Sequence, residues 1–164
     1  ISPDNLNIED FLIIKPKIST INKIVGVCVL PFHNKKFYLM KGWRHQFDKV
    51  IFQAPCGFVE SGEKPEDTAL RELEEETSLT CTKKNLIPLG SYLPDAGLIE
   101  GRVELFLAKN CQKSREIDKF EIGSSIVYPF TKSELINLIN EESNIGGSTI
   151  VNCFRALFYL EKDS

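Results

Sequence analysis

An acidic stretch over 57–79, GFVESGEKPEDTALRELEEETSL, constrains this chain more than any other part of it. The stretch holds eight of the protein's 23 acidic residues, against two basic ones. Its second half predicts a helix, because Pro65 suits a first helical turn and the residues that follow are mostly good helix formers. Spacings of three and four residues place Glu72, Glu75 and Glu76 on one face of that helix.

Three carboxylates on one helical face repel one another, and a bound divalent cation would remove that cost. Oxygen ligands alone favour a hard ion such as Mg²⁺ or Mn²⁺ over zinc. Ala69 and Leu73 lie on another face of the helix, where they can pack inward. The alternative is a solvated acidic face, which is the commoner use of a glutamate-rich helix.

The helix belongs to a longer pattern, which reads Gly57, five residues, Glu63, seven residues, and then RELEEETSL over 71–79. This pattern resembles the Nudix box, G-x5-E-x7-R-E-U-x-E-E-x-G-U with U aliphatic, at every defined position except one. The exception is Ser78, where the family usually has Gly. Because that Gly takes a left-handed conformation near the helix end, Ser should cost about 1 kcal/mol there.

The resemblance implies the α/β/α Nudix sandwich, in which a mixed β-sheet lies between helices. Hydrophobic patterning agrees, since it predicts strands before and after the acidic helix and helices at the end of the chain. The expected strands are 24–32, 37–41, 50–54, 86–93, 103–108 and 126–130. The expected closing helices are one that is capped by Thr131 or Ser133 and runs through Asn140, and one over 149–160.

A length of 164 residues suits one domain. We expect that domain over 23–164. It follows an N-terminal extension over 1–22, whose apolar residues 11–14 could form an edge strand.

Net charge and cysteine content limit the classes of partner and compartment. A net charge of −3 argues against non-specific nucleic-acid binding, which needs a basic face. The five cysteines are odd in number and include no C-x-x-C pair, so they suit reduced thiols in a cytoplasmic protein better than disulfides or a zinc site. No apolar run reaches membrane-spanning length, and nothing at the N-terminus is typical of a signal peptide.

Members of the Nudix family hydrolyse a nucleoside diphosphate linked to another moiety, so the resemblance implies a role for each charged residue of the box. Glu72 and Glu76 should bind metal, with Glu75 sharing a metal or positioning its water. The backbone carbonyl of Cys56 matches the position of a further metal ligand. Arg71 should orient the carboxylates by ion pairing rather than contact the substrate.

Bound metal ions would neutralise phosphate charge and lower the pKa of a ligated water. Glu63 should either anchor the loop or join a metal, and a purely structural role is an equal alternative for it. Gly57 opens the motif.

The residues after the box resemble one subgroup of the family, the ADP-ribose and ADP-sugar pyrophosphatases. Pro94 falls fifteen residues after the end of the box. Pro94, Gly97 and an LFLA-like strand, here 105–108, recur together in that subgroup. The resemblance continues over 115–160 and implies that Pro94 and Gly97 lie on the substrate side of the site.

An acidic loop, REIDKFEI over 115–122, is similar to the loop in which this subgroup carries a candidate general base. Glu116 and Asp118 are therefore expected to supply that base, with Glu121 behind them. The alternative is a solvated acidic loop.

The chain departs from the subgroup just before the box. It has WRHQF over 43–47 where the subgroup often reads Gln-Tyr-Arg, and QAPCG over 53–57 where the subgroup reads Glu-Leu-Pro-Ala-Gly. Trp43 and Phe47 could stack on a base, and Arg44 could pair with a phosphate. The alternative is an edge-strand aromatic pair beside a solvated arginine.

A second departure is Gly101, which stands where the subgroup usually has Glu, with Glu100 and Glu104 as neighbours. These positions lie where the nucleotide and its distal sugar would bind, so they leave the choice of sugar open. His33 and His45 have no metal-ligand partners in the sequence and are expected at the surface.

The leading hypothesis is a Mg²⁺-dependent pyrophosphohydrolase that cleaves a nucleoside diphosphate sugar, with ADP-ribose first, into a nucleoside monophosphate and a sugar phosphate. A second enzymatic hypothesis takes a dinucleoside polyphosphate or an oxidised nucleoside triphosphate as substrate, although the residues around Pro94 argue against it. A hypothesis of another class is a sensor that binds a nucleotide sugar without cleaving it. Such sensors usually lose a box carboxylate, whereas this chain keeps them all.

The resemblance also implies a homodimer. Its interface should be reduced or different, because the N-terminal part is shorter than the extra domain of many relatives.

Overall fold

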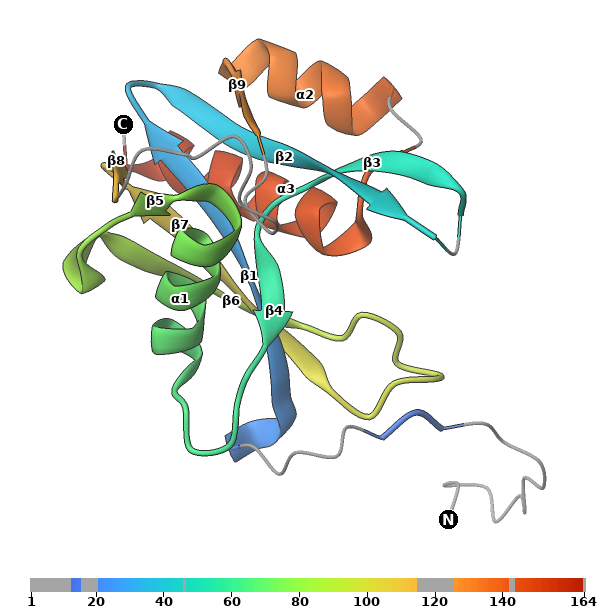
Figure 1. Cartoon of the computed structure of the whole chain (residues 1–164). Coiled ribbons are helices and arrows are strands. Elements are labelled where there is room, and N and C mark those ends of the chain that lie inside the picture. Colours follow the sequence, from blue (N-terminus) through green and yellow to red (C-terminus); the bar gives the residue numbers. More distant parts are fainter. Residues whose placement is uncertain (1–12, 16–20, 46, 115–125, 142–143, 164) are drawn as a thin grey trace.

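The computed structural model describes residues 13–15, 21–45, 47–114, 126–141 and 144–163. Within these residues, seven strands form one mixed sheet and three α-helices pack against it (Figure 1). The strands of this sheet are β1 (Ile24–His33), β2 (Lys36–Arg44), β3 (Lys49–Gln53), β4 (Cys56–Phe58), β6 (Leu86–Tyr92), β7 (Arg102–Lys109) and β9 (Val127–Phe130). The helices are α1 (Pro65–Thr77), α2 (Lys132–Glu141) and α3 (Gly147–Lys162).

Two short strands, β5 (Leu79–Thr80) and β8 (Gln112–Lys113), pair outside the main sheet. Two 3-10 turns, η1 (Ile21–Lys23) and η2 (Lys83–Asn85), precede β1 and β6.

The main sheet runs in the order β3-β2-β1-β7-β6. Its central pair, β1 and β7, is parallel, with Cys28 opposite Leu105, whereas the other pairs are antiparallel. Strand β4 adds to the first half of β1, and β9 adds to β2. The connection from β1 to β7 therefore contains α1, which returns the chain across one face of the sheet.

Strand β1 is buried on both faces, which explains its continuous apolar sequence. Cys28 and Leu30 face a core completed by α2 and α3, where they join Ala156 of α3. Val27 and Val29 face a second core, formed with α1. Helices thus cover both faces of the sheet, which confirms the predicted α/β/α sandwich with a mixed sheet.

The predicted strands and closing helices are present, with shifts at their ends. Strand β2 continues three residues beyond the predicted 37–41, so that Trp43 and Arg44 lie on the strand. Helix α3 begins at Gly147 rather than at residue 149. Strands β4, β5 and β8 were not predicted, because two or three residues are too short to show a periodicity.

The predicted edge strand near the N-terminus is described only at its end. Ile14 forms a single bridge with Ile99, and its N–H and C=O bond to Leu98 and Glu100. Residues 11 and 12 lie outside the described part of the chain. The division into an extension over 1–22 and a domain over 23–164 stays a prediction.

Candidate active site

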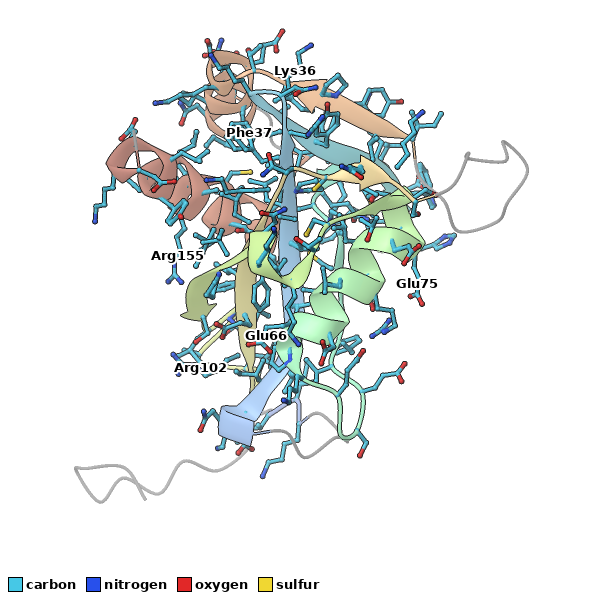
Figure 2. All side chains as sticks on the ribbon, turned by 90° about the vertical axis from the view of Figure 1, so that its left-hand side faces the viewer. Lys36, Phe37, Glu66, Glu75, Arg102 and Arg155 are labelled. Carbon is cyan, nitrogen blue, oxygen red and sulfur yellow. The ribbon has the colours of Figure 1, made fainter. Side chains whose placement is uncertain are left out.

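Helix α1 positions the acidic residues of the box. It begins at Pro65, with Glu66 and Asp67 in the first turn, where carboxylates complement the helix dipole. Ala69 and Leu73 are fully buried in the core that α1 shares with β1. That packing turns the opposite side of the helix outward, as Figure 2 shows for Glu75.

Helix α1 ends in the left-handed conformation that was expected at Ser78, where the box usually has Gly. Ser78 adopts a left-handed conformation with φ 54° and ψ 25°, and its N–H donates to the carbonyl of Glu74 at 2.8 Å. The Ser78 side chain is buried, and its hydroxyl has no hydrogen-bond partner. Serine therefore takes the geometry that usually favours Gly, with an unpaired polar atom in addition.

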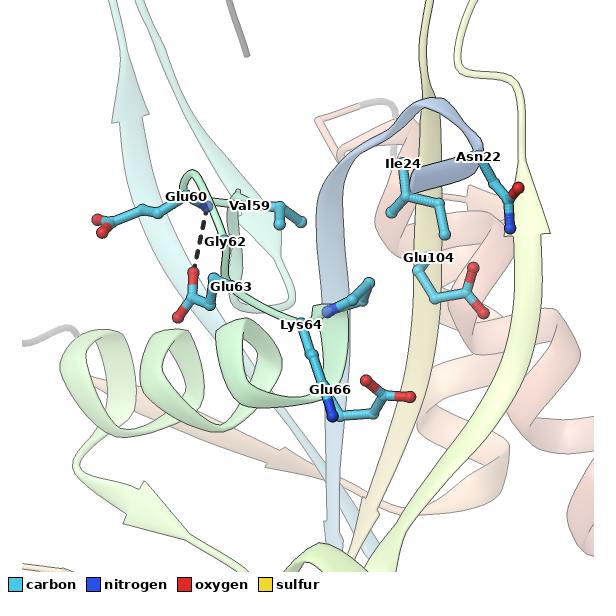
Figure 3. A pocket seen from close by; sticks show the side chains of 10 residues that line it. Asn22, Ile24, Val59, Glu60, Gly62, Glu63, Lys64, Glu66 and Glu104 are labelled. Atoms are coloured by element: carbon cyan, nitrogen blue, oxygen red, sulfur yellow. Dashed lines mark hydrogen bonds between the residues drawn. The ribbon is translucent and has the colours of Figure 1, made fainter. Parts of the chain in front are cut away.

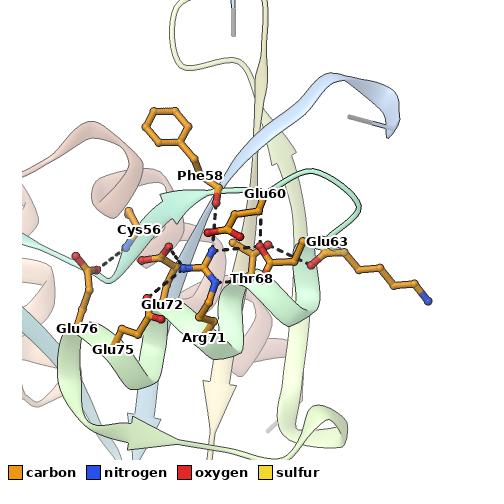
Figure 4. Close-up of polar contacts among 10 residues, drawn as sticks. Cys56, Phe58, Glu60, Glu63, Thr68, Arg71, Glu72, Glu75 and Glu76 are labelled. Atoms are coloured by element: carbon orange, nitrogen blue, oxygen red, sulfur yellow. Dashed lines mark hydrogen bonds and ion pairs between the residues drawn. The ribbon is translucent and has the colours of Figure 1, made fainter. Parts of the chain in front are cut away.

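Arg71 is the centre of the charged cluster (Figure 4). Its Nε and Nη2 donate to the two carboxylate oxygens of Glu63, each at 3.1 Å. Its Nη1 donates to Glu72 at 2.7 Å and to Glu75 at 3.1 Å. A further bond at 3.3 Å reaches the carbonyl of Phe58 and ties the end of β4 to the helix.

The paired hydrogen bonds from Arg71 fix the charge state of Glu63, on the loop before α1. The hydrogen bonds from Arg71 lower the pKa of Glu63 to about 2, so this carboxyl is ionised throughout the neutral range. The same partners raise the pKa of Arg71 above its usual value.

Gly57 provides the space that Glu72 occupies. A Cβ atom at position 57 would lie 1.9 Å from Oε1 and 2.6 Å from Oε2 of Glu72. No side chain other than hydrogen fits beside this carboxylate where it stands. The Gly that opens the box is therefore explained by close approach, since its φ lies outside the left-handed region.

Glu76 is half-buried and lies beside the start of β4. Its Oε2 accepts the backbone N–H of Cys56 at 2.9 Å, which joins the end of α1 to the start of β4. Burial, together with the negative charges of Glu72 and Glu75, raises the pKa of Glu76 to about 7. The charged form is therefore costly unless a cation lies nearby.

Among the described residues, no three His, Cys, Asp or Glu side chains already converge as a metal site. Arg71 instead neutralises Glu72 and Glu75. The donors nevertheless fit a hard divalent cation, because they are carboxylate oxygens beside the space left by Gly57. A cation near Glu76 would also offset the cost of its buried charge.

The residues expected on the substrate side fall into two places. The first is the end of β2 and the turn after it, where Trp43 is 48% exposed and Phe47 is 70% exposed. Trp43 Nε1 donates to His45 Nδ1 at 3.2 Å. Phe47 lines a cavity of about 440 Å³ together with Lys49 and the segment 144–147.

The second place is the loop between β6 and β7. Pro94 and Gly97 are both exposed there, and Asp95 Oδ1 accepts the N–H groups of Gly97 and Leu98 at 3.0 and 3.1 Å. Within the described residues, no hydrogen bond or ion pair joins either place to the α1 carboxylates. The predicted bases Glu116 and Asp118, with Glu121, lie outside the described residues.

Arg44 links the β2 end to the box. Its Nη2 donates to Gln53 Oε1, and its charge lowers the pKa values of both Cys56 and Glu76 against the raising effect of burial. The guanidinium therefore lies close to the buried carboxylate. Gln53 is buried and was not predicted as part of the site. The one sequence signal for it was that the subgroup has Glu at this position.

Gly101, the second departure from the subgroup, has a packing explanation. It is buried, and a Cβ atom there would lie 2.6 Å from Cγ2 of Val25. A Glu at this position is incompatible with Val25 as placed.

A larger cavity of about 570 Å³ lies on the other side of the box loop (Figure 3). Its lining includes Glu66, at the start of α1, and Glu104, on β7. Partial burial and the charge of Glu66 raise the pKa of Glu104. Sequence reasoning identified Glu104 only as a neighbour of Gly101, because no local pattern brings β7 to the start of α1.

No helix in the described part of the chain is long and apolar enough to cross a membrane.

The chain is similar in sequence to several proteins, among them two from Bacillus species. It is 37% identical to an ADP-ribose pyrophosphatase of Bacillus subtilis (strain 168) over 89 residues, which cover 52% of this chain and 47% of that protein. It is 30% identical to a methanol dehydrogenase activator of Bacillus methanolicus over 130 residues, which cover 77% of this chain and 68% of that protein.

The chain thus spans about half the length of the first of these relatives. Among solved structures, the crystal structure of an ADP compounds hydrolase matches with a TM-score of 0.74 at 14% identity, over 85% of this chain and 74% of that one. That likeness concerns the fold. The NUDIX domain model matches residues 22–117, which is more than half of the chain. The chain therefore belongs to the Nudix hydrolase family.

Proposed function

We propose that this Nudix hydrolase is a Mg²⁺-dependent pyrophosphohydrolase of a nucleoside diphosphate sugar, with ADP-ribose as its first candidate substrate. The observation that carries the proposal is the gathering of Glu72, Glu75 and Glu76 on α1 beside the Cys56–Gly57 segment. The similarity to an ADP-ribose pyrophosphatase over 52% of the chain supports this choice of substrate. Water would add across the P–O–P bridge to release AMP and a sugar phosphate.

Mg²⁺, or Mn²⁺ in its place, would supply charge neutralisation at the pyrophosphate and a ligated water of lowered pKa. In this proposal Glu72, Glu76 and the carbonyl of Cys56 hold the metal, and Glu75 shares it or positions the water. The burial of Glu76 supports the assignment, because a buried carboxylate gains most from a neighbouring cation.

Arg71 and Glu63 act by positioning. Arg71 holds the carboxylates of Glu72 and Glu75 close together, and its paired hydrogen bonds with Glu63 anchor the loop before the helix. Both oxygens of Glu63 are engaged by Arg71, which favours the anchoring role of Glu63 over direct metal binding.

Substrate recognition is proposed at the end of β2. Arg44 lies close enough to Glu76 to lower its pKa, a place suited to pairing with a phosphate of the bound substrate. Trp43 and Phe47 offer exposed ring faces for stacking on the base. Pro94 and Gly97 would border the distal sugar, and Glu116 or Asp118 would serve as general base.

The test is release of AMP from ADP-ribose, followed by chromatography with Mg²⁺ and with Mn²⁺. A panel with GDP-mannose, UDP-glucose, NADH and diadenosine polyphosphates separates the sugar nucleotide hypothesis from the dinucleotide one. Glu76→Gln should abolish turnover, whereas Glu74→Gln, on the exposed side of the same helix, should not. Binding of nucleoside diphosphate sugars with no hydrolysis of any of them would refute the proposal and favour the sensor.

We further propose a homodimer and a cytoplasmic location. The dimer rests on resemblance to the subgroup, and sedimentation velocity of the purified chain tests it. The location rests on the cysteines, all five of which are free thiols in the structure, as suits a reducing compartment.

A further inference from the structure

Two of the free cysteines, Cys81 and Cys111, each lie one residue beyond the short sheet formed by β5 and β8, at the same end of it. In this antiparallel pair Leu79 lies opposite Lys113, and Thr80 lies opposite Gln112. The next pair in the same register is Cys81 and Cys111. Directly opposite residues in antiparallel strands have Cα atoms about 4.5–5.5 Å apart, which is within the range of about 4.4–6.8 Å that a disulfide spans.

The side chains of this pair also meet. Cys111 is buried in the core between α1 and the sheet, and Cys81 packs against that core from its edge. Both side chains therefore belong to one cluster, and each thiol shifts the pKa of the other. Because β5 directly follows α1 and β8 directly follows β7, the pair lies where two segments distant in sequence meet.

We propose that Cys81 and Cys111 form an oxidation site, at which a hydroperoxide converts the two thiols into a disulfide. The site is independent of the proposed substrate, since neither cysteine is assigned to the reaction.

The two thiols have unequal roles. Cys81 is half-buried and remains accessible to a small oxidant, whereas Cys111 is buried and donates to the carbonyl of Ala108 at 3.1 Å. The neighbouring Cys111 thiol lowers the pKa of Cys81, while Cys81 and burial raise the pKa of Cys111. Cys81 is therefore the nucleophile and Cys111 the resolving thiol.

The electrons balance in two steps. The Cys81 thiolate attacks one oxygen of the hydroperoxide, the O–O bond breaks, and an alcohol or water leaves with the proton, which makes Cys81 a sulfenic acid. The Cys111 sulfur then attacks the Cys81 sulfur, the S–O bond breaks, and the departing hydroxide takes the Cys111 proton to leave as water. Two thiols lose two electrons, which the hydroperoxide accepts.

The molecule contains a matched comparison. Cys28 and Cys56 also lie directly opposite each other, in the antiparallel pair of β1 and β4. Cys28 is fully buried, and its sulfur already accepts a hydrogen bond from Asn152 Nδ2 at 3.5 Å, so it is held inside the core. The two pairs share this antiparallel arrangement but differ in their surroundings. We therefore expect oxidation to link Cys81 to Cys111 before it links Cys28 to Cys56.

The disulfide would tie the end of α1 more firmly to the end of β7. Ser114 already bonds to the carbonyl of Ser78 through its N–H at 2.9 Å and its hydroxyl at 3.2 Å. A covalent link three residues from each of these positions would close a loop that contains β6 and β7. A link of this kind should raise the melting temperature by about 5–10 °C.

The experiment treats the reduced full-length chain with hydrogen peroxide and maps its cysteines by mass spectrometry without reduction. We expect a peptide pair linked through Cys81 and Cys111, a mass loss of two hydrogens, and a rise in melting temperature that dithiothreitol reverses. Free thiols at both positions, a sulfinic acid at Cys81 without the link, or earlier linkage of Cys28 to Cys56 would each overturn the proposal.

Two variants separate the roles of the thiols. Cys81→Ser should leave Cys111 unmodified and abolish the peroxide-induced rise in melting temperature. Cys111→Ser should let a dione probe trap the sulfenic acid at Cys81. Modification of Cys111 in the Cys81→Ser variant would contradict the assignment of Cys81 as the nucleophile.

Discussion

The carboxylate of Glu72 lies where a side chain on Gly57 would have to be, with its Cδ 2.0 Å from the ideal Cβ position. The contact joins β4 to the middle of α1, two elements that the box sequence separates by a loop. The atoms in the way end a flexible side chain, so we expect a side chain at position 57 to displace this carboxylate rather than the backbone.

Gly57→Ala should therefore lower activity without unfolding the protein. We expect kcat to fall by about 10- to 100-fold, because a displacement of about 1 Å in a catalytic group costs that much. The free energy of unfolding should change by less than about 1 kcal/mol, since the displaced atoms end a flexible side chain. Steady-state kinetics and urea unfolding measure the two effects, and full activity in Gly57→Ala would contradict the role given to this contact.

A double-mutant cycle identifies the cause. If Gly57→Ala acts through the Glu72 carboxylate, then adding it to Glu72→Ala should reduce metal binding little further. Additive losses, measured by calorimetric titration of Mg²⁺, would show that Gly57 acts on another part of the site.

Glu76→Gln should stabilise the metal-free protein at high pH. The folded-state pKa of Glu76 is about 7, above its ordinary value of 4.5, so the protein loses stability as pH rises through 7. The amide can still accept the Cys56 N–H and carries no buried charge. Allowing for partial solvent access, we expect a gain of about 1–2 kcal/mol at pH 8.

The gain from Glu76→Gln should vanish near pH 4.5, where the folded wild-type carboxyl is already neutral. Chemical unfolding at several pH values in the presence of a chelator measures this profile. Glu74→Gln is the matched control, because Glu74 is exposed on the same helix and should show no comparable pH dependence. If Glu76→Gln is less stable than wild type at pH 8, then the charge of Glu76 in the wild-type protein is already compensated by another group.

Ser78→Gly should stabilise the fold by about 1 kcal/mol. The substitution removes the cost of a left-handed non-glycine residue and a buried hydroxyl without a partner. Thermal unfolding checks it against Ser133→Gly, in the exposed first turn of α2, where ordinary helical geometry makes the same substitution destabilising. If the two substitutions change the stability in the same direction, strain at Ser78 is not the cause.

Arg71→Lys should weaken the loop before α1, because an ammonium cannot reproduce the two parallel hydrogen bonds to Glu63. In the wild-type protein this pairing lowers the pKa of Glu63 to about 2, so its stabilisation is present above pH 4.5 and is lost as pH falls toward 2. The variant should lose that stabilisation at neutral pH and show a smaller decline in acid. NMR titration of the carboxyl groups measures the pKa of Glu63. A pKa that stays near 2 in the Arg71→Lys variant would contradict this account.

Local sequence was sufficient for the longer strands, the helices and the acidic face. The β-branched run over 24–32 and the spacing of Ala69 and Leu73 each predicted their element, because periodicity reports which side of an element is buried. The left-handed Ser78 was likewise foreseen from its place in the box. The three strands of two or three residues escaped, since pairing partners rather than local pattern determine them.

The sequence by itself determined the family and the order of the box, because helical spacing is a local geometry that puts Glu72, Glu75 and Glu76 on one face wherever the helix lies. Only the tertiary structure decided which groups from distant segments meet one another. The Phe58 carbonyl at Arg71, the Cys56 N–H at Glu76, and Cys111 opposite Cys81 come from segments 13, 20 and 30 positions away in the chain. Packing of α1 against β1 and β7 brings them together, and no local propensity specifies those distances.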